Sequence, residues 1–257
     1  MNISVLQANI YANTYKETLF PYLQKNDFDI LCFQEITGPN AKFGNINSSE
    51  DNYDELKELL DEKYTSVLQI TERFTNDPNT YFANAIFYKK NFVLKNKHEV
   101  FMNKRSTPFA ADSKAYEKLS RALLDIELEK NGKIFHVLTT HFAWGGTLYE
   151  KPHQTEQGRI MLEYIKSVEE PFIFTGDFNL DPQQPTIKAL GNYARNLVVE
   201  NGITNTLNPR IHSAKHMFPK GGAVDFVFVS RDIEVTQFTI VEEDISDHFA
   251  LSTQLNI

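Results

Sequence analysis

Eight polar residues stand at the ends of apolar runs in this 257-residue chain, and all are of types that bind cations or transfer protons. They are Asn9, Glu35, His141, Asp177, Asn179, Asp225, Asp247 and His248. A rigid strand fixes a side chain at its end and the adjoining loop leaves it accessible, so α/β folds place catalytic groups there. The sequence contains no GxGxxG, P-loop, HExxH, CxxC or GxSxG pattern, so dinucleotide, nucleoside-triphosphate, zincin and serine-hydrolase chemistry has no support.

Taken singly, each of these residues also has a structural interpretation. The Asn and Asp residues are common turn formers, Glu35 could lie on the surface, and the two histidines could be satisfied by local hydrogen bonds. Asp225 is harder to explain because it interrupts the apolar run 223–229, where an unpaired carboxylate is costly. It therefore needs a partner, and the series as a whole indicates a site.

Short β-like runs alternate with helical patterns along the chain, and these elements must position the polar residues. Strands are predicted over residues 3–6, 29–33, 64–70, 82–88, 92–101, 119–129, 134–140, 171–175, 224–229, 235–241 and 249–255. Helices are predicted around residues 15–23, 53–60 and 161–168, and a fourth begins at Asp181-Pro182 or at Pro185. Pro21 kinks the first helix or marks its start. The run 29–33 does not alternate, which predicts burial on both faces.

Turns and loops complete this outline. Asn131-Gly132 predicts a tight hairpin between two strands, because both residues tolerate positive φ. Polar segments 37–51, 103–118 and 201–222 are expected to be long loops of one compact domain. Hairpins together with βα alternation favour mixed sheets sandwiched between helices.

Composition bounds the class of protein. With 26 Lys and Arg against 34 Asp and Glu, the net charge is −8, which argues against a protein that coats nucleic acid but allows a small basic patch. Cys32 is the only cysteine, which excludes a disulfide scaffold and a thiolate zinc site. No apolar run approaches the roughly 18 residues of a membrane span, and residues 1–7 lack the features of a signal peptide. We expect a single domain over residues 1–257, cytoplasmic and monomeric, without an obligate protein partner.

Six motifs in order carry a resemblance to a known family. They are Leu6-Gln7-Ala8-Asn9-Ile10, Phe33-Gln34-Glu35, Thr140-His141-Phe142, Gly176-Asp177-Phe178-Asn179, Val224-Asp225-Phe226-Val227-Phe228 and Ser246-Asp247-His248. Together they resemble the endonuclease/exonuclease/phosphatase superfamily, the deoxyribonuclease-I-like metal-dependent phosphoesterases. The similarity spans residues 3–250, and the combination of GDFN, SDH and an upstream QE is specific. It implies an α+β fold, a four-layer α/β/β/α sandwich of two mixed sheets flanked by helices.

The resemblance implies a divalent metal ion at the site. Phosphodiesters hydrolyse slowly because water is a poor nucleophile and charge accumulates on the phosphoryl oxygens. Mg²⁺, or Mn²⁺ in its place, neutralises that charge and prefers oxygen ligands. Glu35 is the main ligand expected, with Asn9 and Asp247 close to it.

The same resemblance assigns proton-handling roles. Asp177, steadied by Asn179, would position or deprotonate the attacking water. His248, oriented by Asp225, would donate a hydrogen bond to a non-bridging phosphate oxygen, and such a pair favours the protonated imidazole. His141 would assist the leaving group or stabilise charge.

Five further residues are weighed beside this set. Arg121, inside an apolar strand, either grips a phosphate, as in family members that resemble the chain here, or is an exposed strand arginine. Lys220 is a second phosphate-binding candidate, and Trp144 either stacks on a base or sugar or packs in its loop. His212 and His216 have the i, i+4 spacing of half a metal site on a helix, but flanking prolines and the lack of cysteine argue against zinc.

The substrate class is left between two alternatives. We favour a metal-dependent phosphodiester hydrolase acting on nucleic-acid ends, single strands or nucleotides, by attack of water on phosphorus. The alternative is a phosphatase or phosphodiesterase for a small phosphorylated metabolite, an inositol phosphate or a lipid headgroup, which the acidic composition suits. A binding module on the same fold that lacks catalytic activity is disfavoured, because every position expected to bind metal or handle water has a residue of the required type.

Overall fold

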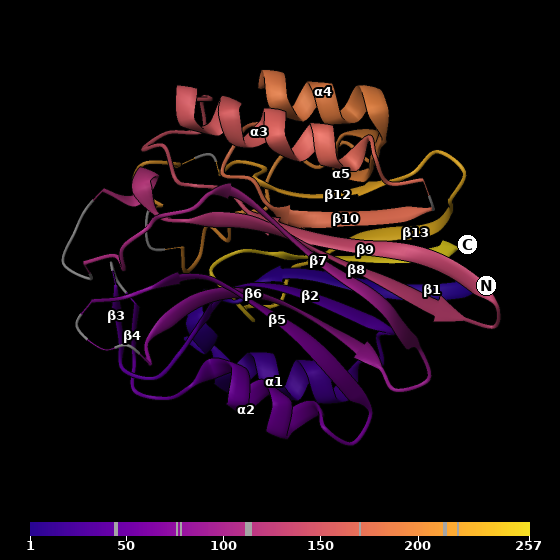
Figure 1. Ribbon diagram of the computed structural model, residues 1–257, viewed down its shortest axis with the longest axis horizontal. Coiled ribbons are helices and arrows are strands. Elements are labelled where there is room, and N and C mark those ends of the chain that lie inside the picture. The colour runs from indigo at the N-terminus through magenta and orange to yellow at the C-terminus, as the bar shows by residue number, and fades with distance from the viewer. Residues whose placement is uncertain are drawn as a thin grey trace.

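A computed structural model shows two six-stranded sheets packed face to face, with helices on the outer face of each (Figure 1). The structure describes residues 1–43, 46–75, 77, 79–110, 115–169, 171–212, 215–219 and 221–257. Helices α1 (Lys16–Lys25) and α2 (Asn52–Leu60) cover the first sheet, and α3 (Pro152–Ile165), α4 (Pro185–Tyr193) and α5 (Leu197–Glu200) cover the second. The predicted four-layer α/β/β/α sandwich is confirmed.

Both sheets are mixed, as predicted. The first contains, in spatial order, β13 (Glu234–Val241), β14 (Ala250–Asn256), β1 (Asn2–Asn9), β2 (Ile30–Thr37), β6 (Tyr81–Lys89) and β5 (Tyr64–Arg73). The second contains β11 (Arg195–Asn196), β12 (Asp225–Val229), β10 (Phe172–Asp177), β9 (Lys133–His141), β8 (Arg121–Lys130) and β7 (Val93–Asn103). Parallel pairing joins β1 to β2 and β9 to β10, and the other described pairs in these sheets are antiparallel.

This topology brings the polar strand ends to one edge of the molecule. In the parallel pairs the carboxyl ends of both strands meet at the same edge, so Asp177 lies opposite His141 in the register. Asp177 also lies opposite Asp225 at the start of the antiparallel β12. The two chain termini lie at the other end of the sheets (Figure 1), where the ammonium of Met1 donates to the Ile257 carbonyl over 2.6 Å.

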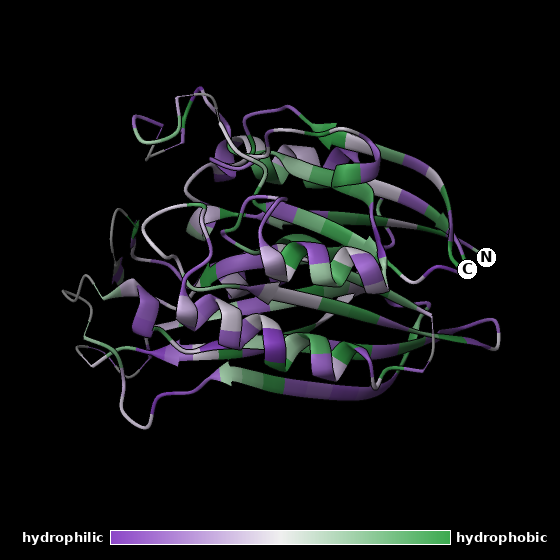
Figure 2. Cartoon of the chain, turned by 90° about the horizontal axis from the view of Figure 1, so that it is seen from above, coloured by the Kyte–Doolittle hydropathy of each residue, from purple (hydrophilic) through white to green (hydrophobic). Residues whose placement is uncertain are grey.

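The sandwich has three apolar layers, one between the sheets and one under the helices on each side, and strand alternation divides the side chains between them. On β1, Val5 packs into the layer between the sheets and Leu6 into the layer under α1 and α2. On β2, Cys32 and Phe33 divide in the same way, so the predicted burial on both faces is confirmed for residues 30–33, whereas Asp29 is only partly buried. Seen from above, the helices over the second sheet carry both hydrophobic and hydrophilic residues along their length (Figure 2). None of the helices that the structure describes is long and apolar enough to cross a membrane.

The predicted starts of two helices need correction or refinement. Helix α3 begins at Pro152, well before residue 161. The sequence pattern missed the first turns because the buried positions there are Gln154 and Gln157, not apolar residues. Both side chains are hydrogen-bonded to the backbone of Ala143. Helix α4 begins at Pro185 rather than at Asp181, whose carboxylate accepts a local bond within the preceding turn.

The predicted loops also contain short elements. The loop 37–51 contains a small hairpin of β3 (Ala41–Phe43) and β4 (Ile46–Ser48), and 3₁₀ turns occur at Tyr11–Asn13 and Tyr116–Lys118. The turn at Asn131 and Gly132, with φ of 55° and 77°, is the predicted hairpin.

Gly176 on β10 has no room for a side chain beside β9. A Cβ atom there would lie 2.4 Å from the Thr140 carbonyl oxygen and 2.9 Å from its Cγ2. Gly176→Ala must therefore push the two strands apart, and we expect it to lower the free energy of unfolding by about 1–3 kcal/mol in urea titrations. Gly191→Ala on α4, where the nearest atom would be 4.0 Å away, is the matched control and should not destabilise. Equal stability of the two variants would contradict this account of the strand contact.

Candidate active site

The strand ends enclose a pocket of about 320 Å³. Its wall includes nine of the residues singled out in the sequence: Glu35, Arg121, His141, Trp144, Asp177, Asn179, His212, Asp247 and His248. Asn9 and Asp225 lie directly behind this wall, hydrogen-bonded to Asp177 and His248. Lys220 falls outside the described residues. Segments more than 200 residues apart in sequence therefore meet in one place.

Asp177 is held through both carboxylate oxygens. Its Oδ2 accepts a hydrogen bond from Asn9 Nδ2 over 3.0 Å, and its Oδ1 accepts one from the backbone N–H of Asn179 over 2.9 Å. Burial, and then the negative charge of Asp225, raise the pKa of Asp177 to about 6, although nearby His248 opposes the rise. A carboxylate of this kind is ionised at neutral pH and is still basic enough to accept a proton.

His248 and Asp225 form a buried pair. His248 Nδ1 lies 2.9 Å from Asp225 Oδ2, while Asp225 Oδ1 accepts a bond from Gln7 Nε2 over 3.3 Å and the backbone N–H of Asp225 donates to Thr206 Oγ1 over 3.1 Å. Burial alone would lower the pKa of His248, but the carboxylates of Asp225 and Asp177 outweigh it and hold that pKa well above its usual value. The imidazole is therefore cationic, with Nε2 left to face the pocket.

His141 is a neutral imidazole beside the two carboxylates. Its Nε2 lies 3.1 Å from the Asn179 amide nitrogen, 3.6 Å from Asp177 Oδ2 and 3.8 Å from Glu35 Oε1. Burial, and then the positive charge of Arg121, keep the pKa of His141 well below its usual value. This ring acts through hydrogen bonds rather than through charge.

Glu35 has an unusual backbone conformation. Its φ of 58° is in the left-handed region, and the pairing of β2 with β6 shifts register between Phe33 and Ile36. A non-glycine residue held in this region costs about 1–3 kcal/mol, and such strain clusters at functional sites. The bulge aims the carboxylate into the pocket, where its ligand atom and those of His141 and Asp177 lie within 4.8 Å of one another. Burial raises the pKa of Glu35.

The donor set around Glu35 fits a hard divalent cation. It offers the carboxylates of Glu35 and Asp177, the imidazole of His141 and the adjacent amide of Asn9, and Mg²⁺ prefers the oxygen donors among these. Asp247, the third metal ligand expected from the sequence, belongs to a different cluster with His212 and His248. Glu35 and Asp247 therefore line one pocket without sharing a cluster, and Asn9 lies behind the lining, hydrogen-bonded to Asp177.

Arg121 is buried, with 3% of its surface exposed, so the interpretation as an exposed strand arginine is wrong. Its guanidinium lies 5.2 Å from the centre of the Phe82 ring, and among the described residues its buried Nε has no hydrogen-bond partner. Burial lowers the pKa of Arg121 to about 10, which leaves it charged at neutral pH. A buried cation on the pocket wall with an unsatisfied N–H is suited to an anionic ligand.

The rest of the pocket lining is apolar or aromatic. It consists of Tyr11, Ile46, Phe82, Tyr116, Leu119, Leu148, Leu207, Phe218 and Val224, and Trp144 adjoins it. Trp144 is half-buried and packs edge-on against Phe218, with ring centres 5.7 Å apart. Trp144 thus both packs in its loop and presents a surface to the pocket, so the two interpretations of this residue are compatible.

Sequence reasoning missed two buried amides behind the site. Gln7 and Gln34 exchange side-chain hydrogen bonds of 2.7 and 2.9 Å, and Gln34 Nε2 also donates to Thr139 Oγ1 on the second sheet over 2.7 Å. They tie the sheets together and orient Asp225 through Gln7. The available signal was an amide within each apolar run, two residues before Asn9 and one before Glu35.

Sequence reasoning also missed the position of His212. It lines the pocket, whereas His216 is exposed, and the described residues around them form turns rather than a helix. The i, i+4 spacing therefore does not create a site. The actual neighbour of His212 is His248, with ring centres 5.4 Å apart.

Comparison with known proteins agrees with this geometry. A sequence model described as the Endonuclease/Exonuclease/phosphatase family matches residues 6–248. No curated protein sequence matches significantly.

Several solved structures share the fold over nearly all of both chains. An endonuclease/exonuclease/phosphatase from Bacteroides vulgatus is 16% identical with a TM-score of 0.73, covering 100% of this chain and 99% of the other. A mannosyl-6-phosphatase from Bacteroides thetaiotaomicron is 19% identical with a TM-score of 0.72, covering 99% and 100%. The catalytic domain of human Nocturnin with bound sulfate is 17% identical with a TM-score of 0.68, covering 99% and 93%. With the family match spanning nearly the whole sequence, the chain belongs to the endonuclease/exonuclease/phosphatase family of hydrolytic phosphoesterases.

Proposed function

We propose that this protein is a divalent-metal-dependent hydrolase of a small phosphorylated molecule, which it cleaves by attack of water on phosphorus. One observation carries the proposal. A buried carboxylate, Asp177, and a buried imidazolium, His248, lie side by side in the pocket, with Asp177 Oδ2 3.9 Å from His248 Nδ1. A base for water and a cation for the phosphoryl oxygens are the two groups that this hydrolysis needs from the protein.

The attacking water is handled by Asp177. Glu35 and Asn9 would hold Mg²⁺ or Mn²⁺, which would neutralise phosphoryl charge. Each oxygen of Asp177 already accepts one hydrogen bond, from Asn9 and Asn179 respectively. These two bonds fix the plane of the carboxylate. A remaining lone pair of Asp177 then has a fixed direction and accepts the proton of the attacking water.

The developing negative charge is met by His248 and Arg121. Asp225 accepts a hydrogen bond from Nδ1–H of His248, which directs Nε2–H to a phosphate oxygen. Arg121 supplies a second, buried cation from β8. Such preorganised donors stabilise the transition state more than the substrate.

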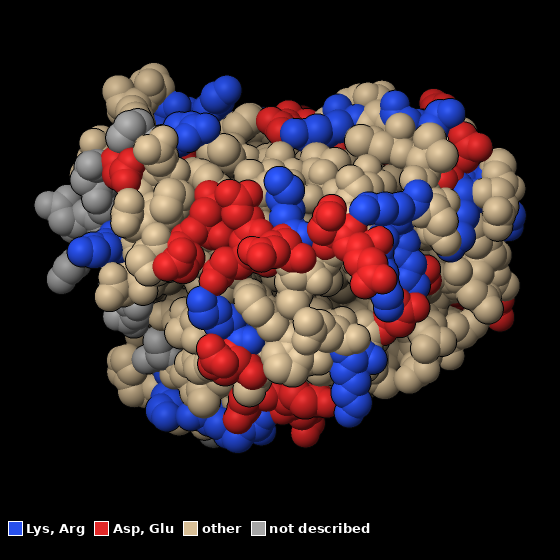
Figure 3. Space-filling model, turned by 90° about the horizontal axis from the view of Figure 1, so that it is seen from below, with Lys and Arg blue, Asp and Glu red and all other residues tan. Residues whose placement is uncertain are grey.

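The pocket walls favour a small substrate over a polymer. Arg121 is the one Lys or Arg among the described residues that line the pocket, whereas a nucleic-acid groove needs a row of them. The face that carries α1 and α2 shows a connected group of acidic side chains, with basic ones interspersed (Figure 3). A relative of similar fold is described as a mannosyl-6-phosphatase, which supports the same class.

A nucleotide or nucleic-acid end is the second candidate, and Trp144 favours it. A half-buried indole on the pocket wall suits stacking on a base. A single terminal nucleotide would also fit without a basic groove, since it presents one or two phosphates to Arg121 and His248.

A substrate panel separates the two candidates. With Mg²⁺ or Mn²⁺, kcat/KM would be compared for p-nitrophenyl phosphate, bis-p-nitrophenyl phosphate, sugar phosphates, nucleotides, single- and double-stranded oligonucleotides and a 5′-tyrosyl end. We expect the highest values on small phosphoesters. The second candidate would be established instead if kcat/KM were higher for oligonucleotides than for every small substrate and if Trp144→Ala lowered that value.

Arg121→Gln tests the phosphate contact. Losing a charge-assisted hydrogen bond is expected to lower kcat/KM by about 10–100-fold, because such bonds contribute about 1.5–3 kcal/mol. Arg121→Lys should lose less because it keeps the charge. Arg159→Gln, which breaks ion pairs with Glu156 and Glu163 on α3 away from the pocket, is the matched control. A normal kcat/KM in Arg121→Gln would remove this residue from the site.

A further inference from the structure

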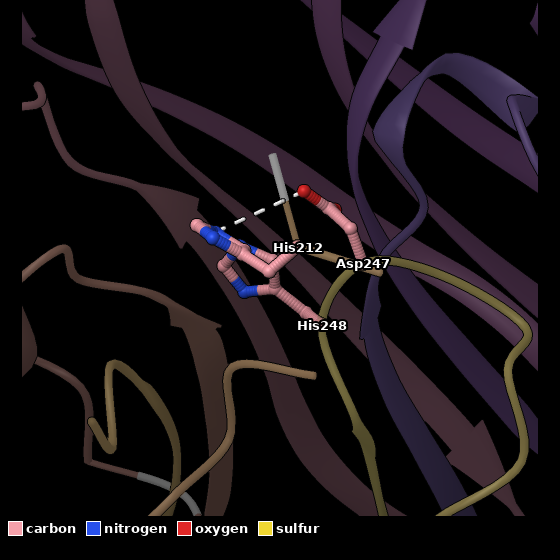
Figure 4. Close-up of side chains that lie close together, drawn as sticks. All are labelled: His212, Asp247 and His248. Atoms are coloured by element: carbon pink, nitrogen blue, oxygen red, sulfur yellow. Dashed lines mark ion pairs between the residues drawn. The ribbon is translucent and has the colours of Figure 1, made fainter. Parts of the chain in front are cut away.

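A second cluster of potential metal ligands lies at the same pocket, composed of His212, Asp247 and His248 (Figure 4). The three residues each offer one ligand atom, and these atoms all lie within 4.8 Å of one another. His212 Nε2 is 3.8 Å from Asp247 Oδ2, the contact marked by the dashed line. The His212 and His248 rings are 5.4 Å apart and inclined by 54°. None of these residues belongs to the Glu35 cluster.

The cluster is enclosed and partly preorganised. Only 11% of the His212 side chain, 4% of Asp247 and 8% of His248 are exposed. Asp225 holds His248 through Nδ1, which is the carboxylate–histidine arrangement that orients imidazole ligands in metal sites. His212 reaches the cluster from the loop 201–222, whereas Asp247 and His248 precede β14. The site therefore joins two segments of the chain.

The donor chemistry differs from that around Glu35. Two imidazole nitrogens and one carboxylate oxygen suit Zn²⁺, whose bonds to such atoms are about 2.0–2.2 Å long. Two donors 3.8 Å apart can both reach one ion at that bond length. Mg²⁺ takes oxygen ligands and retains water, so it has no preference for this cluster.

We propose that His212, Asp247 and His248 form a Zn²⁺ site separate from the Mg²⁺ position, and that Zn²⁺ bound there inhibits hydrolysis. Binding replaces the Nε2 proton of His248 with the ion, and the proton leaves to solvent. His248 then has no N–H to donate to a phosphate oxygen. The inhibition rests on the proposed function, whereas the Zn²⁺ binding does not.

Calorimetric titration tests the binding directly. ZnCl₂ would be added to the folded protein in saturating Mg²⁺, using the parent, His212→Asn and His216→Asn, with circular dichroism to verify folding. We expect one Zn²⁺ site in the parent, weakened about 100-fold or more in His212→Asn, since removing a group that merely supports a ligand already costs about 10–100-fold. His216→Asn, in the same loop but exposed, should match the parent. Absence of binding by the parent, or equal binding by the parent and His212→Asn, would overturn the site.

Two further measurements separate the parts of the proposal. Anomalous diffraction at the zinc edge should place the ion among His212, Asp247 and His248, and a peak at Glu35 instead would overturn the site without any variant. The Zn²⁺ concentration that halves hydrolysis should rise in His212→Asn by the same factor as the dissociation constant. Binding through His212 without inhibition would refute the inhibitory role alone. A protein with no hydrolase activity, but with His212-dependent binding, would overturn the proposed function and leave the site established.

Discussion

Replacing Asp177 with Asn is expected to lower kcat by about 10²–10⁴, with a much smaller change in KM. Asn has nearly the same shape, but its amide cannot take the proton of an attacking water. The carboxylate is held by Asn9 and by the Asn179 backbone, so the substitution should remove the chemistry while leaving the pocket in place. Steady-state kinetics on a phosphoester found in the substrate panel would measure the effect.

A double variant makes this test sharper. His248→Ala should cost a similar factor in kcat, and the combination of Asp177→Asn with His248→Ala should cost less than the sum of the two free-energy losses, because both groups act on one transition state. Asp181→Asn, four residues along in the next turn, is the control and should keep normal kinetics. Near-normal kcat in Asp177→Asn would mean that another residue handles the water.

Removal of the metal ion is expected to have an effect of comparable size. Activity should be abolished by EDTA and restored by Mg²⁺ or Mn²⁺. Glu35→Gln should lower activity by about 10²-fold or more, because the loss of one carboxylate ligand weakens metal binding. Titration of activity against Mg²⁺ concentration would show the higher concentration that the variant needs. Glu58→Gln, an exposed glutamate on α2, is the matched control.

Stability separates a lost ligand from a damaged fold. Burial raises the pKa of Glu35, so its charge is unfavourable in the metal-free protein. Metal-free Glu35→Gln should therefore unfold at a urea concentration no lower than the parent. Full activity of the parent in excess chelator, with no tightly bound metal, would refute the metal assignment.

The position of the site could be predicted because it follows from strand ends. Polar residues after apolar runs mark the carboxyl ends of strands, and parallel pairing of β1 with β2 and of β9 with β10 must bring these ends together. The hairpin at Asn131 and Gly132 was likewise determined locally, by residues that tolerate positive φ.

What could not be predicted depends on contacts between distant segments. The left-handed Glu35 is fixed by the pairing of β2 with β6, not by its own preference. The early start of α3 depends on buried glutamines that find partners at Ala143. The surroundings of His212 could not be predicted for the same reason, because its neighbours Asp247 and His248 are more than 30 residues away in sequence.

The arrangement of the chain ends makes the fold nearly a closed ring. Met1 and Ile257 are hydrogen-bonded to each other, and Lys133, next to the turn at Asn131 and Gly132, donates to the same Ile257 carbonyl over 2.7 Å. That turn and both termini therefore share one end of the sheets (Figure 1), and none of the three contributes a residue to the pocket lining. A circular permutant that joins the old termini through a short linker and opens between Asn131 and Gly132 would keep every strand end that forms the pocket, because new ends are best tolerated at exposed turns close to the old ones.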